Sequence, residues 1–151
     1  MKKNLLSLFV VLFAAVACGN KNQNTDQNVA ERKTISLSKK DFLNKVWNFE
    51  ADSLEWNHLG DKPAIIDFYA DWCAPCKAIE PTLEELAHEY YGQIYIYKVN
   101  VDKERALAEA LNIQSLPTLL FVPMEGEVNV VRGRITRAVF KEHINNFLLR
   151  N

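Results

Sequence analysis

Two cysteines, Cys73 and Cys76, are separated by two residues and follow directly on an apolar segment. The pattern predicts that a buried strand ends just before them and that a helix begins at Cys73. Unpaired backbone N–H groups and the positive end of the helix dipole favour a thiolate at that position. Cys76 lies one turn further along the same helix face, within reach of the Cys73 sulfur. The spacing therefore predicts a dithiol/disulfide redox centre.

A lone carboxylate is the second chemical feature. Residues 64–70 are nearly all apolar, as in a strand covered on both faces, but Asp67 stands in their middle. Because burial disfavours an ionised carboxylate, we expect a raised pKa for Asp67, which makes it a proton acceptor beneath the dithiol. Lys98 occupies the matching position on the next predicted strand and is a candidate partner. An edge strand that exposes Asp67 to water is the alternative.

The elements that must position these side chains alternate between strands and helices. The strand-like segments are residues 34–37, 64–70, 94–101, 118–122 and 128–132, of which the last two form a hairpin. The helical segments are residues 38–47, 73–90, 104–111 and 136–148. This alternation predicts an α/β domain, with a central mixed sheet flanked by helices on both faces.

The region around the cysteines resembles the active site of the thioredoxin family. The resembling segments are Trp72-Cys73-Ala74-Pro75-Cys76-Lys77 and, before it, Ile65-Ile66-Asp67-Phe68. Further matches are Pro81, Lys98-Val99-Asn100-Val101-Asp102, Leu116-Pro117-Thr118 and Gly133. Because the similarity runs from Thr34 to the C-terminus, we expect residues 34–151 to adopt the thioredoxin fold.

The resemblance implies a role for each matching residue. Cys73 would be the nucleophile that attacks a substrate disulfide, and Cys76 would resolve the mixed disulfide by attacking Cys73. Asp67 would assist the deprotonation of Cys76. Pro117 would follow a cis peptide bond beside the cysteines, and the backbone of Leu116 would bind an extended substrate. The other residues lining the groove would be Trp72, Ala74, Pro75 and Gly133.

Three features depart from the family pattern. Ala74 replaces the usual glycine between the cysteines, where the residue helps to set the redox potential. Arg132 stands where the family usually has an apolar groove residue, so the substrate preference is expected to differ. Residues 50–62 form a longer connection whose apolar side chains either pack on the domain edge, as we expect, or dock a partner. His58, within this connection, is expected to be a polar surface residue.

The N-terminus predicts export. A short basic region precedes an apolar run over residues 5–16, which is too short to span a bilayer, so residues 1–17 are expected to be a signal peptide. The residues up to Cys18 resemble the bacterial lipobox, in which the cysteine is lipidated; the alternative is cleavage after Ala17 that leaves Cys18 free. Residues 18–33 predict a flexible tether. We therefore expect a periplasm-facing membrane lipoprotein of a Gram-negative bacterium.

Composition and charge argue against several other classes of function. A net charge of −1 without a basic cluster gives no electrostatic case for nucleic-acid binding. The three histidines are too scattered to complete a four-ligand zinc site with the paired cysteines, and Lys77 stands where a c-type haem site needs His. We expect a monomer that uses neither a metal nor another cofactor.

The combined features predict a protein-disulfide reductase. Its substrates would be disulfide-containing envelope proteins, and its electrons would come from a membrane carrier or another thioredoxin-like donor. An envelope oxidant or isomerase is the alternative within the same chemistry. A binding module with an inert disulfide is the non-enzymatic alternative, and Asp67 argues against it, because an inert disulfide gains nothing from a buried acid.

Overall fold

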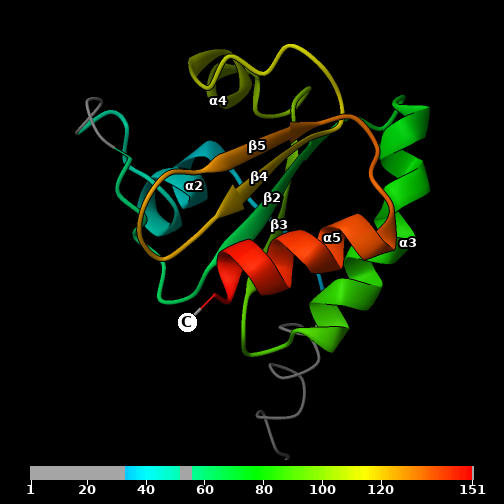
Figure 1. Cartoon of the computed structure of the whole chain (residues 1–151). Coiled ribbons are helices and arrows are strands. Elements are labelled where there is room, and N and C mark those ends of the chain that lie inside the picture. Colours follow the sequence, from blue (N-terminus) through cyan, green and yellow to red (C-terminus); the bar gives the residue numbers. More distant parts are fainter. Residues whose placement is uncertain (1–32, 52–55, 151) are drawn as a thin grey trace, which may run out of the picture.

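A central sheet with helices on both faces forms the fold of the computed structural model, which describes residues 33–51 and 56–150 (Figure 1). The elements in chain order are β1 (Ile35–Ser36), α2 (Lys39–Lys45), β2 (Ala64–Tyr69), α3 (Ala74–Glu89), β3 (Tyr95–Asn100), α4 (Arg105–Ala110), β4 (Thr118–Val122), β5 (Asn129–Arg132), α5 (Arg137–His143) and the π-helix η1 (Ile144–Leu148). None of the helices in these two ranges is long and apolar enough to cross a bilayer. The predicted signal peptide, Cys18 and the tether up to residue 32 lie outside the described residues.

The sheet is mixed, as the sequence predicts, with the strand order β1-β3-β2-β4-β5. β2 pairs parallel to β3 and antiparallel to β4, and the β4–β5 hairpin completes one edge. β2 is therefore a central strand with hydrogen-bonded neighbours on both sides. Asp67 lies opposite Lys98 of β3 and Leu119 of β4. The alternative in which Asp67 belongs to an exposed edge strand is wrong.

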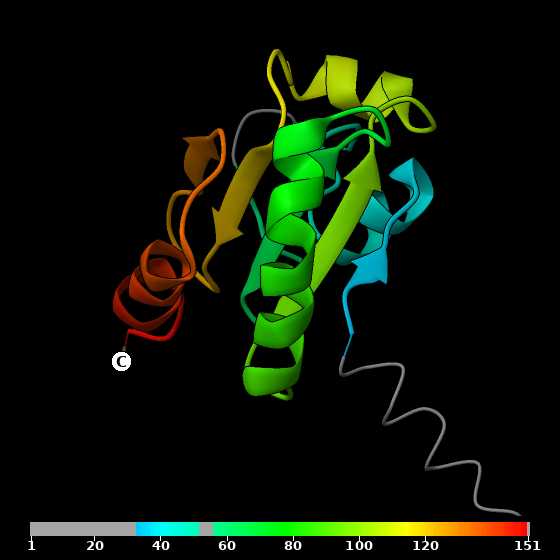
Figure 2. The ribbon, with the colours of Figure 1, turned by 90° about the vertical axis from the view of Figure 1, so that its right-hand side faces the viewer.

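The alternation of side chains along β2 divides the core between the two faces of the sheet. Ile65 packs in one apolar cluster with buried residues of α3, α5 and η1. Ile66 and Phe68 pack in a second cluster on the other face, with buried residues of α2 and α4. Figure 2 shows α3 lying across the first face. Because Asp67 has the same parity as Ile65, its side chain points to the face that α3 covers.

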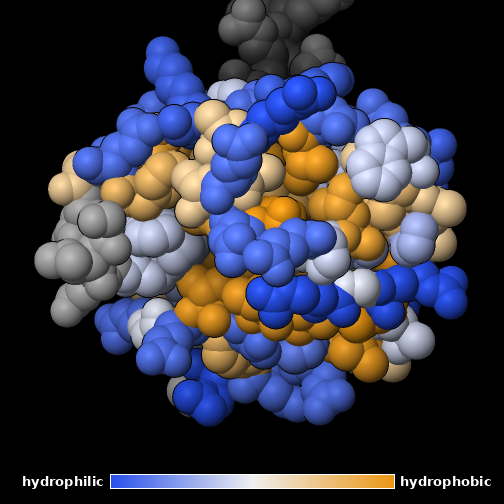
Figure 3. All heavy atoms as spheres, turned by 90° about the horizontal axis from the view of Figure 1, so that it is seen from above, coloured by the Kyte–Doolittle hydropathy of each residue, from blue (hydrophilic) through white to orange (hydrophobic). Residues whose placement is uncertain are grey.

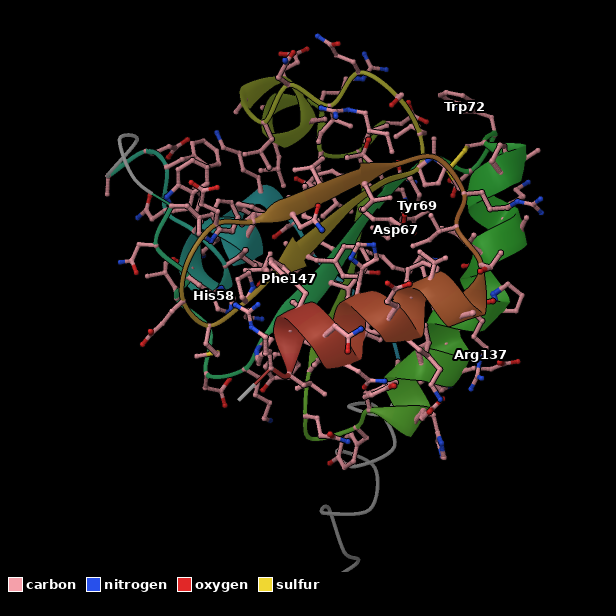
Figure 4. All side chains as sticks on the ribbon, viewed as in Figure 1. His58, Asp67, Tyr69, Trp72, Arg137 and Phe147 are labelled. Carbon is pink, nitrogen blue, oxygen red and sulfur yellow. A yellow bond between two sulfur atoms is a disulfide. The ribbon has the colours of Figure 1, made fainter. Side chains whose placement is uncertain are left out.

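The helix termini follow the sequence, except at the end of the chain. Ser38 forms a capping box with Asp41 at the start of α2, and Thr136 caps α5 with its side-chain oxygen. The last predicted helix is divided, because the α-helical pattern of α5 passes into the wider turn of η1. Its apolar face is nevertheless preserved, since Ile144 and Leu148 are buried and Phe147 packs beside them (Figure 4).

The described part of the 50–62 connection packs on the edge of the domain, as expected. The rings of Trp47 and Trp56 lie 4.7 Å apart between centroids, and Phe49 packs edge-on to Trp47 at 5.6 Å. His58 is more than a polar surface residue, because its ring nitrogens lie 2.8 Å from the Lys62 carbonyl oxygen and 3.3 Å from that of Val46. These contacts hold the connection against the end of α2, and Figure 4 shows His58 at the opposite side of the molecule from Trp72.

Candidate active site

The two cysteines lie at the start of α3 and are joined by a disulfide. Cys73 is the N-cap residue and Cys76 lies in the first turn, with a Cα–Cα distance of 5.3 Å. The backbone N–H of Cys76 donates to the Cys73 sulfur at 3.2 Å. Pro75 fits in this turn because first-turn N–H groups lack intrahelical acceptors. After reduction, the same N–H and the helix N-terminus would favour a thiolate on Cys73.

Trp72 stands at the surface directly before the cysteines. It is 71 % exposed, and its indole N–H donates to the Asp102 carboxylate at 2.9 Å (Figure 4). The backbone N–H of Asp102 in turn donates to the side-chain oxygen of Asn100, at the end of β3. Asp102 therefore orients Trp72. Sequence reasoning recognised Asp102 only as part of a matching segment, since the pairing joins two loops that are distant in the chain.

The predicted groove residues approach the cysteines from a different part of the chain. The Leu116–Pro117 peptide bond is cis, as the family resemblance implies. Leu116 is partly buried and packs against the cluster that contains Cys73 and Cys76. The N–H of Gly133 donates to the Pro117 carbonyl at 2.8 Å, and its φ of +86° is a conformation that side-chain-bearing residues rarely adopt. Leu116, Pro117 and Gly133 therefore lie at the same end of the sheet as the two cysteines.

The face that carries this site is partly apolar. Figure 3 views the molecule from the end at which α3 begins, and it shows exposed hydrophobic side chains with hydrophilic side chains lying between and around them. Ala74 and Pro75 are exposed beside Trp72, whereas Cys73 and Cys76 are only 5 % and 3 % exposed. A partner that reaches the sulfurs must therefore contact the apolar surroundings as well.

Asp67 is buried beneath the disulfide. It is 1 % exposed, and its Oδ1 atom has no hydrogen-bond partner among the described residues. Burial raises the pKa of Asp67 to about 7, the positive charge of Lys98 opposes the rise, and the negative charge of Glu80 adds to it. The expected pKa elevation is therefore present, and its main cause is the predicted one, desolvation.

A small cavity of about 100 Å³ lies between Asp67 and the Cys76 end of the disulfide. The residues lining this cavity, hereafter the Asp67 cavity, are Asp67, Tyr69, Ala70, Asp71, Cys76, Lys77, Glu80 and Lys98. Cys76 reaches it, but Cys73 does not line it. The arrangement can pass a proton between a buried carboxyl group and one of the two sulfurs, either directly or through water that the cavity has room to hold.

Lys98 is near Asp67, but its ammonium group pairs with a different carboxylate. The Lys98 Nζ atom forms an ion pair with Glu80 and lies 4.5 Å from the centre of the Tyr69 ring. Glu80 was missed by sequence reasoning, although its position four residues after Cys76 places both on one face of α3. Within residues 33–51 and 56–150, no group of three or more His, Cys, Asp or Glu side chains is placed so that it could hold a metal ion.

Comparison with known proteins places the chain in a family. Residues 33–146 match the family model described as Thioredoxin. A thioredoxin of Borreliella burgdorferi is 45 % identical over 113 residues, which cover 75 % of this chain and 96 % of that protein.

Two solved structures agree with this fold. Chloroplastic thioredoxin z superposes with a TM-score of 0.64 at 26 % identity, covering 76 % of this chain and 93 % of its own. A mutant thioredoxin from Halobacterium salinarum NRC-1 gives a TM-score of 0.61 at 27 % identity, covering 78 % of this chain and 93 % of that protein's chain. The chain belongs to the thioredoxin family, adopts the thioredoxin fold and is a protein-disulfide oxidoreductase.

Proposed function

We propose that this protein reduces disulfides of exported proteins in the cell envelope, to which it is attached through a lipidated Cys18. Cys73 is the attacking nucleophile, Cys76 resolves the mixed disulfide, and Asp67 accepts the proton that Cys76 releases. The substrates are disulfide-containing envelope proteins, and the electrons arrive from a membrane carrier or another thioredoxin-like donor.

The reaction runs in two exchanges. The Cys73 thiolate attacks a substrate disulfide, which forms a Cys73–substrate bond and releases one substrate thiolate. Cys76 then gives its proton to the Asp67 carboxylate and attacks the Cys73 sulfur. The bond between Cys73 and the substrate breaks, and the electron pair leaves with the second substrate sulfur, which takes a proton from solvent. Substrate is reduced by two electrons, and the Cys73–Cys76 pair is oxidised by two.

The observation that carries the proposal is the Asp67 cavity, which Asp67 and Cys76 line together. A carboxyl group with a pKa of about 7 can both accept and return a proton near neutral pH. A binding module with an inert disulfide would keep the cost of this buried acid without any use for it. The cavity reaches Cys76 and not Cys73, which supports different roles for the two sulfurs.

The substrate would bind on the face shown in Figure 3, where hydrophobic side chains are exposed beside hydrophilic ones. Leu116 lies just before β4, outside the sheet, so its backbone can pair with an extended substrate segment. Trp72, Ala74 and Pro75 would contact the substrate from one side. Pro117 and Gly133, which are hydrogen-bonded to each other, would contact it from the other side.

The direction of electron flow is tested by the reduction potential of the Cys73–Cys76 pair. We expect a value near that of thioredoxins, about −270 mV, because Pro75, Lys77 and Asp67 follow the thioredoxin pattern. The measurement is an equilibrium titration of the purified protein against a thioredoxin couple and against glutathione. Since about 30 mV corresponds to a tenfold change in this two-electron equilibrium, the method resolves the alternatives. A reduction potential of about −120 mV would make the protein an oxidant.

Attachment to the membrane is tested separately by Cys18→Ser. We expect this variant to leave the membrane fraction for the soluble fraction, because it loses the acylated residue, while its specific reductase activity stays unchanged. The measurements are fractionation of cells that produce each form and reduction of insulin by the purified proteins. A variant that stays membrane-bound contradicts lipidation of Cys18, and one that loses activity contradicts the assignment of residues 18–33 as a tether.

A further inference from the structure

The Asp67 cavity contains a second carboxylate that the mechanism above does not use. Glu80 lies on α3, and its carboxylate forms an ion pair with Lys98 of β3. The Lys98 side chain is 10 % exposed and that of Glu80 is 51 % exposed, so the pair joins the interior of the cavity to solvent. The ammonium group of Lys98 also lies over the ring of Tyr69, 4.5 Å from its centre, in a cation–π contact.

The position of the Lys98 ammonium group determines whether the Asp67 carboxylate has an ion-pair partner. The two residues are opposite each other in the β2–β3 register, so a lysine without another partner would be expected to bind the Asp67 carboxylate. The ammonium group lies instead on Glu80, and Asp67 Oδ1 has no hydrogen-bond partner among the described residues. The other charged groups that line the cavity, Asp71 and Lys77, are exposed to solvent, which screens them.

We propose that Glu80 is a positioning residue of the redox site: by binding the Lys98 ammonium group, it prevents a direct ion pair between Lys98 and Asp67 and leaves the Asp67 carboxyl group free to exchange a proton with Cys76. This inference rests on the proposed function. Two effects of Glu80 have the same sign. Its own negative charge disfavours a second carboxylate nearby, and its hold on Lys98 prevents an ion pair that would favour one.

The consequence for the reaction concerns its second exchange. The proton that leaves the Cys76 sulfur moves to Asp67, and Asp67 must lose it to solvent before the next cycle. An Asp67–Lys98 ion pair would stabilise the carboxylate and make it a weaker base for the Cys76 thiol. Glu80 prevents this while standing at the exposed end of the cavity, through which the proton returns to water.

The first test uses Glu80→Gln in the oxidised protein, in which the cysteines do not titrate. We expect the pKa of Asp67, followed by the ¹³C shift of its side-chain carboxyl carbon, to fall by about one pH unit. Glu85→Gln is the matched control, because Glu85 lies on the same helix and is paired with Arg137, away from the cavity. An unchanged or higher pKa in Glu80→Gln, or an equal fall in Glu85→Gln, overturns the inference.

A double-mutant cycle tests whether Glu80 acts through Lys98. Lys98→Met should raise the pKa of Asp67, because it removes the cation that opposes the elevation. In the Lys98→Met background, Glu80→Gln should lower the pKa by less than half of its effect in the wild type. An equal effect in both backgrounds would mean that Glu80 acts through its own charge alone, and the positioning role would be wrong.

The pH dependence of insulin reduction separates this inference from the proposed function. The rate should rise with pH as Asp67 ionises, and in Glu80→Gln this rise should move to lower pH by the same amount as the carboxyl titration, about one unit. An active wild type whose profile does not move in Glu80→Gln contradicts the role of Glu80 alone. A wild type without reductase activity contradicts the proposed function, while the carboxyl titration still decides whether Glu80 controls Asp67.

Discussion

The Cys76→Ser variant is expected to retain substrate proteins on Cys73 through a disulfide, and the Cys73→Ser variant is expected to retain none. Cys73 attacks first because it is the N-cap of α3 beside exposed Trp72, where the helix N-terminus and the Cys76 N–H favour its thiolate. Without the Cys76 thiol, the mixed disulfide has no internal resolving group. Both variants should lose roughly 10³-fold or more in turnover, because the two sulfurs act as a unit.

The trap is measured on envelope extracts as a mass increase that disappears on reduction. Both substitutions are made in a Cys18→Ser background, so that one thiol remains in each protein. Burial does not explain the expected asymmetry, because the two cysteines are 5 % and 3 % exposed. It follows from their positions in the first turn of α3. Equal trapping by the two variants would contradict the assigned order of attack, and trapping by neither would favour the binding module.

The fold was predictable because its sequence patterns are unambiguous. The nearly continuous apolar run of β2 requires cover on both faces, and the apolar stripe of α3 supplies that cover on one of them. The central position of β2 then makes burial of Asp67 unavoidable. Cys73 could be placed at a helix start because Pro75 is accepted in a first turn and poorly elsewhere.

The partner of Lys98 could not be predicted in the same way. The strand register correctly placed Lys98 opposite Asp67, but it says nothing about where a long and flexible side chain ends. Glu80 competes successfully because it is half exposed and keeps much of its contact with water, whereas an ionised Asp67 must be desolvated. Whether Lys98 pairs with Asp67 or with Glu80 therefore depends on the solvent exposure of each carboxylate in the folded protein. The position of α3 over β2 and β3 determines this exposure.

The stacking of the 50–62 connection was predictable only in outline. An apolar side chain such as Trp56 favours packing on the domain edge, and its contact with Trp47 confirms this. The two contacts of the His58 ring depend on the path of the backbone around Gly60. Any residue with a side chain at that position would place its Cβ atom only 2.7 Å from the His58 Nε2 atom. No residue pattern encodes that path in advance.

Asp67→Asn is expected to stabilise the oxidised protein strongly at alkaline pH while slowing its turnover. The folded protein holds the Asp67 proton up to a pH of about 7, whereas the unfolded chain releases it near the ordinary value of 3.8. Between these values the folded state binds more protons, so stability falls as pH rises. The contribution is fully present below about pH 4 and is lost by about pH 8, a difference of roughly 4 kcal/mol for this buried group.

The measurement is denaturant unfolding of wild type and Asp67→Asn from about pH 4 to about pH 8. The two curves should meet at the acid end and separate by several kcal/mol at the other. Asp41→Asn is the control of opposite sign, because hydrogen bonds from Ser38 hold the pKa of Asp41 below its ordinary value. That variant should be less stable than wild type at neutral pH, and the difference should vanish as the pH falls through the Asp41 pKa.

The same Asp67→Asn protein should reduce insulin more slowly near neutral pH, because the Cys76 thiol has lost its proton acceptor. Its rate should recover as the pH rises toward the ordinary pKa of a thiol, where hydroxide and water replace the carboxylate. If Asp67→Asn both raises the stability and lowers the turnover, the Asp67 carboxyl group serves the reaction although it destabilises the folded protein. A stability gain with an unchanged pH–rate profile would leave Asp67 without a catalytic role.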